Sequence, residues 1–68
     1  MNKIPLPLKE YLARQIEEVL SPLNIWGTGQ ELDRTVDTTD KDDRNALFEH
    51  WARSGAMEKF HSRHKIVV

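Results

Sequence analysis

The sequence predicts a small all-α domain of two or three helices, with a long acidic loop between the first helix and the second. Apolar residues recur at spacings of three and four near the N-terminus and again after residue 41. This is the period of an α-helix with one apolar face. A polar stretch separates the two segments. The chain has 68 residues, so residues 1–68 are expected to form a single domain.

The first helix is predicted over residues 7–20. Pro5 and Pro7 suit the start of a helix, where the missing N–H of proline is not needed. Pro22 disfavours helical backbone at the residue before it, so the helix is expected to end near residue 20. The apolar residues of this segment share one helical face, and they are Leu8, Leu12, Ile16, Val19, Leu20 and Leu23.

The segment 27–40 is predicted to be a polar loop. Gly27 and Gly29 flank a single threonine, which is typical of a turn. Between residues 27 and 45 the only large apolar residues are Leu32 and Val36, so the pattern leaves open a short helix over residues 30–36 or extended chain over residues 33–36. A polar segment of this length is uncommon in a compact domain and is typical of a functional or flexible loop. Whether it is ordered without a partner is left open.

The second helix is predicted over residues 41–54, with Thr39 or Asp40 as its N-cap, because acidic residues suit the positive end of a helix. Gly55 separates it from a third helical stretch over residues 56–64. The pattern leaves open whether these are two helices or one bent helix. The β-branched tail at residues 66–68 favours either a short strand or a packed end.

The composition excludes several classes of protein. The chain has no cysteine, so it has neither disulfides nor thiolate zinc ligands, and it suits a reducing compartment. No apolar run approaches the roughly 20 residues of a membrane span, and no signal-like segment opens the chain. We therefore expect a cytoplasmic protein that does not bind membranes. The formal net charge is −1, which is not the charge of a general nucleic-acid binder.

The sequence offers little for catalysis, and we predict a protein that is not an enzyme. A chain this short cannot easily enclose a water-excluding pocket, so no small-molecule substrate and no cofactor are expected. Glu58, His61 and His64 have the spacing of three that metal-binding helices use. These three side chains lack the further ligands that such a site requires, so no metal is predicted.

The large apolar side chains outnumber what two amphipathic helices can cover. Some of them are therefore expected to be exposed in the isolated chain and covered by a protein partner or by a second copy. The predicted partner-binding residues are Trp26, Phe48, Trp51, Met57 and Phe60. The expected function is a non-enzymatic protein–protein interaction module, such as a small regulator, an inhibitor or a subunit of a larger assembly. Small bacterial or phage accessory proteins are commonly of this kind.

The alternative function is weak nucleic-acid binding through the basic segment 53–65. Four basic side chains there can neutralise a few phosphates, which gives weak and salt-sensitive binding. They are Arg53, Lys59, Arg63 and Lys65. A solvated helix face explains the same pattern, so we place this alternative second.

Overall fold

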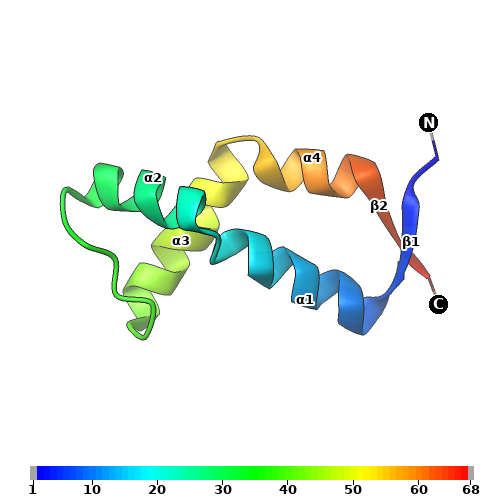
Figure 1. Cartoon of the computed structure of the whole chain (residues 1–68), viewed down its shortest axis with the longest axis horizontal. Helices are drawn as coiled ribbons and strands as arrows, with labels where there is room; N and C mark the ends of the chain where they lie inside the picture. The colour runs from blue at the N-terminus through cyan, green and yellow to red at the C-terminus, as the bar shows by residue number, and fades with distance from the viewer. Residues whose placement is uncertain (1, 68) are drawn as a thin grey trace.

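The computed structural model describes residues 2–67 and contains four helices and two short strands (Figure 1). In chain order they are β1 (Ile4–Pro7), α1 (Leu8–Val19), α2 (Pro22–Leu32), α3 (Lys41–Arg53), α4 (Ala56–Arg63) and β2 (His64–Val67). The strands lie side by side at one end of the molecule, and the loop between α2 and α3 lies at the other (Figure 1). The molecule is elongated, with principal extents of 39 × 22 × 15 Å.

The prediction of an all-α domain with two or three helices is wrong. The chain is mostly helical, but it contains the additional helix α2 and a two-stranded parallel sheet. Helices α1, α3 and α4 lie close to the predicted ranges. Asp40 is the N-cap of α3, since its side chain accepts a hydrogen bond from the Asp43 N–H at 3.0 Å. Gly55 has a left-handed φ of 88° and separates α3 from α4, so these are two helices.

Helix α2 occupies the first part of the predicted loop 27–40, which is thereby shortened to residues 33–40. Pro22 ends α1 but also begins α2, with Ser21 as the N-cap. The two glycines lie inside α2, not in a turn. A Cβ added to Gly27 would lie 2.6 Å from Nε2 of His50. A larger residue here would have to displace the His50 side chain, so the close approach of α2 to α3 favours glycine despite its low helix propensity.

The strands β1 and β2 pair in parallel, with Ile4 opposite His64 and Pro7 opposite Val67. Both prolines interpreted as a helix start belong to this strand, and Pro7, its last residue, is also the N-cap of α1. Proline has no N–H, so the donors that β1 offers to β2 come from the alternate residues Ile4 and Leu6. The outer edge of β1 is correspondingly poor in donors, which discourages further strand pairing there. Val68, the last residue of the predicted tail, lies outside the described residues.

The core is small and largely aromatic. Among residues 2–67 the buried apolar side chains are Leu6, Tyr11, Val19, Leu47, Trp51 and Phe60. Phe60 of α4 contacts both Tyr11 of α1 and Trp51 of α3, with ring centroids 5.0 and 6.2 Å apart. The Trp51 indole also donates a hydrogen bond to Glu18 Oε1 at 3.1 Å. These contacts join α1, α3 and α4 in one cluster.

A buried amide holds α2 against this cluster. Asn24 Nδ2 donates hydrogen bonds to the carbonyl of Val19 at 2.7 Å and to that of Leu47 at 3.0 Å. The first carbonyl belongs to the C-terminal turn of α1, which has no partner within its own helix. The second belongs to α3. One side chain therefore closes the end of α1 and fixes α2 on α3.

Replacing Asn24 by alanine should lower the free energy of unfolding by about 1–3 kcal/mol, because the Val19 carbonyl loses its donor and the Leu47 carbonyl loses a second one. Urea denaturation followed by circular dichroism measures this change. Asn45→Ala is the matched control, since Asn45 is exposed on α3. Equal stabilities for the two variants would contradict the assigned role of Asn24.

Candidate functional site

Helix α1 turns most of its apolar face to solvent, although the sequence pattern places that face in the core. Tyr11 and Val19 are its only buried residues among those described. The side chains that remain exposed recur every four residues and form one continuous row, which we name the α1 ridge. Its members are Leu8 (53% exposed), Leu12 (49%), Ile16 (59%) and Leu20 (42%).

A groove of about 640 Å³ separates the α1 ridge from α3. The buried side chains of Val19 and Leu47 line its bottom, and Phe48, which is 50% exposed, lies on its α3 side. Thr38 and Arg44 are among the polar residues at its rim. The ridge, the groove and Phe48 form a continuous apolar surface. Monomeric proteins rarely expose a large apolar patch unless it is a contact surface.

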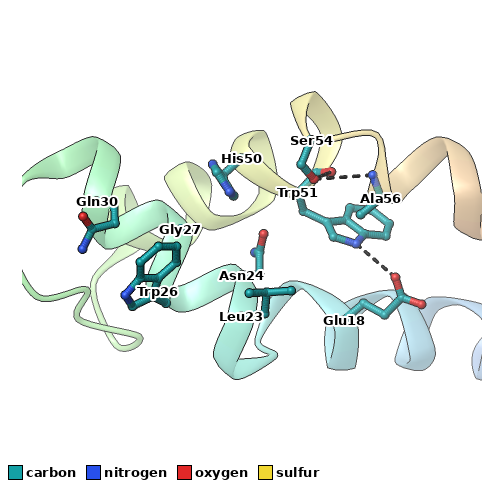
Figure 2. Close-up of a pocket in the computed structure, with 10 residues that line it drawn as sticks. All are labelled: Glu18, Leu23, Asn24, Trp26, Gly27, Gln30, His50, Trp51, Ser54 and Ala56. Carbon is teal, nitrogen blue, oxygen red and sulfur yellow. Dashed lines mark hydrogen bonds between the residues drawn. The ribbon is translucent and has the colours of Figure 1, made fainter.

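A second hollow lies among α1, α2 and α3 and is lined by Trp26 and Trp51 (Figure 2). Three of its polar side chains, those of Glu18, Asn24 and Ser54, bond within the protein. Glu18 accepts the Trp51 indole N–H, and Ser54 Oγ donates to the Trp51 carbonyl at 2.9 Å. Asn24 is committed to two backbone carbonyls. The hollow therefore offers a ligand mainly apolar walls, with few polar groups left to orient a bound small molecule.

The five predicted partner-binding residues fall into three groups. Trp26 and Phe48 are exposed, at 63% and 50%. Trp51 and Phe60 are each 1% exposed and belong to the core, so a partner cannot contact their rings without unfolding the protein. Met57 is half-buried and packs against that core. Sequence reasoning missed the α1 ridge, because periodicity shows that a helix has an apolar face but not what covers it.

The basic side chains of segment 53–65 are exposed but differ in their surroundings. Arg53 on α3 is paired with Glu31 of α2, with a nitrogen–oxygen distance of 2.7 Å. Lys59 and Arg63 share one face of α4, and Lys65 lies in β2. His50 Nδ1 lies 2.9 Å from the other oxygen of Glu31, and the imidazole is the main cause that lowers the pKa of this carboxyl.

The histidines of the candidate metal triad make protein contacts. His61 Nε2 lies 3.0 Å from Gln15 Oε1. The His64 ring stacks on Phe60 with centroids 4.2 Å apart, and its Nδ1 lies 3.0 Å from the Phe60 carbonyl oxygen. Within residues 2–67, no three histidine, cysteine or acidic side chains are arranged to hold a metal ion.

Comparison of the chain with protein-family models, with curated proteins and with solved structures finds no match. In the part of the chain that the structure describes, no helix has the length and apolar character needed to cross a membrane. The surfaces described above are therefore the basis for a functional proposal.

The loop 33–40, which carries Thr38 at the groove rim, is held by a single carboxylate. Both terminal guanidinium nitrogens of Arg34 bond to Asp43, and Asp43 Oδ2 also accepts the Asp37 N–H at 2.8 Å. The Arg34 guanidinium is the main cause that lowers the pKa of Asp43 from 3.8 to about 2. Asp43 lies in the first turn of α3, where a negative charge also suits the helix N-terminus.

Acid should therefore loosen this loop. Folding lowers the pKa of Asp43, so its stabilising contribution is complete above 3.8 and is lost as the pH falls toward about 2. We expect the melting temperature to fall more steeply across this range in the wild type than in Asp43→Asn. Thermal melts at a series of pH values measure the slopes. The exposed neighbour Asp42→Asn is the control, and a wild-type slope in Asp43→Asn would contradict the assignment.

Proposed function

We propose that this chain is a non-enzymatic protein–protein interaction module, a small regulator, inhibitor or assembly subunit that docks through the α1 ridge and Phe48. The observation that carries the proposal is the exposure of the ridge along the whole of α1. Single exposed leucines are normal on protein surfaces, but a row of four beside an exposed phenylalanine is a contiguous patch.

The size of the patch suits a binding surface. Each ridge side chain is about half exposed, so covering it would contribute about 1 kcal/mol of further burial. Four such residues and Phe48 together resemble the apolar centre of an interface, surrounded here by the polar rim of the groove. Helix α1 is long enough, at 12 residues, to present this centre as a rigid element.

The other functional classes have weaker support. Three polar side chains of the Trp26–Trp51 hollow are engaged in bonds within the fold, which disfavours substrate binding. Arg53 is paired with Glu31, which leaves three exposed bases for nucleic acid in a chain of net charge −1. The cysteine-free composition suits a reducing compartment, so the proposal includes a cytoplasmic location.

Ile16→Glu should abolish capture of a protein partner, because it places a charge in the middle of the ridge while leaving the core unchanged. The measurement is affinity capture from a lysate of the source cells with nuclease present, read by mass spectrometry. Leu23→Glu is the matched control, since Leu23 is 78% exposed but lies on α2 and lines the Trp26–Trp51 hollow, not the groove beside the ridge.

A partner retained by Leu23→Glu and lost by Ile16→Glu would support the proposal, provided that both variants keep wild-type circular dichroism. Equal capture by both variants would contradict it, as would recovery that disappears on nuclease treatment.

A further inference from the structure

The chain exposes more surface than a compact monomer of its mass. Its accessible area is 5245 Å², whereas a folded monomer of 7.9 kDa exposes about 4,400 Å². Its radius of gyration is 13.0 Å, compared with about 11 Å for a compact domain of this length. The surplus of about 800 Å² is the area that each partner buries in a standard protein–protein interface.

The α1 ridge is shaped to pack on another ridge of the same kind. Its side chains follow a row of i, i+4 positions, from Leu8 to Leu20. When two helices interdigitate rows of this type, they cross at about −50°, the commonest packing angle in globular proteins. A second copy of this helix supplies the matching row.

A second row on α1 carries charges that complement themselves. Lys9, Ala13 and Glu17 also follow the i, i+4 pattern, are all exposed, and run along the side of the ridge that faces away from the groove. Within residues 2–67, neither Lys9 nor Glu17 forms an ion pair. The row has a base at one end, an acid at the other, and a small residue between them. In a second copy that runs antiparallel, the same row is reversed, so each charge lies opposite a charge of the other sign.

We propose that two copies of this chain associate through α1, antiparallel about a two-fold axis close to Ala13. In this arrangement Lys9 of one copy lies level with Glu17 of the other, and the contact occurs twice by symmetry. Leu12 of one copy falls midway between Leu12 and Ile16 of the other, so the ridges interleave. The proposal deepens the proposed function by naming its partner, and it depends on the same face of α1.

The ion pairs are within reach at the proposed crossing. Lys9 and Glu17 each lie four residues from Ala13, which is about 6 Å along the helix axis. Helices that cross at about 50° separate by only a few ångströms over that distance, which is within the reach of a lysine side chain. The alanine at the centre lets the two backbones approach closely.

A charge-reversal series tests the register of the dimer. Sedimentation equilibrium over a range of concentrations should show the purified wild type as a dimer. Lys9→Glu or Glu17→Lys alone should weaken dimerisation by about tenfold, since two exposed ion pairs become two repulsive contacts. The double variant K9E/E17K should recover wild-type association, because it restores both pairs with exchanged partners. Failure of the double variant to recover would overturn the proposed register.

Cross-linking tests the position of the two-fold axis independently. The chain has no cysteine, so Ala13→Cys introduces a single thiol, and two such thiols would meet at the axis. Under mild oxidation this variant should form a disulfide-linked dimer rapidly. Arg14→Cys is the control, because its side chain lies about 100° around the helix from Ala13 and on the side opposite the ridge. Equal cross-linking rates for the two variants would overturn the proposed axis.

The outcomes also separate this inference from the proposed function. Wild-type protein that stays monomeric at all concentrations overturns the second-copy inference. If Ile16→Glu still loses a different captured protein in that case, the interaction module stands with another partner. If the monomer shows no capture that depends on Ile16, both proposals fail. Circular dichroism of each variant confirms that lost association is not lost folding.

Discussion

Trp51 is the side chain on which the arrangement of three helices depends. Its ring lies between Phe48 of its own helix and Phe60 of α4, and its indole N–H is bonded to Glu18 of α1. A buried tryptophan contributes a large apolar area but brings a polar N–H that needs an acceptor. The Glu18 carboxylate meets this need, and in doing so it sets the rotation of α1 about its own axis.

That rotation explains why the α1 ridge faces solvent. With Glu18 directed at Trp51 and Tyr11 against Phe60, the side of α1 that carries these two residues is the one that meets the core. The ridge then borders the open groove between α1 and α3. Within residues 2–67 the ridge side chains stay about half exposed, and small domains commonly complete their cores by association. The same aromatic cluster that stabilises the monomer therefore leaves its apolar contact surface open.

The sequence predicted the local elements better than their assembly. The apolar period and the capping residue Asp40 placed α1, α3 and α4 to within a few residues, because both signals are local. Helix α2 was missed because glycine in a sequence indicates a turn. In the structure Gly27 instead lies within α2, where its small size allows close contact with His50 of α3. The parallel pairing of β1 with β2 joins segments about sixty residues apart, which no local pattern reports.

For the site, Phe48 was predicted and is exposed, whereas Trp51 and Phe60 are in the core. Only knowledge of which side of α1 meets Trp51 could have revealed the ridge.

The parallel sheet has a consequence for the order of folding. Each helix forms from contacts between near neighbours, but β1 and β2 can meet only after the helices between them have brought their ends together. Closing a loop of that length costs conformational entropy that grows with the logarithm of its size, and non-local pairings of this kind slow folding. The four-residue strands carry mostly exposed side chains, with Leu6 alone buried among them. The sheet is thus the last element to assemble and the first to open in fluctuations of the native state. Its amide hydrogens should exchange with solvent sooner than those of α3.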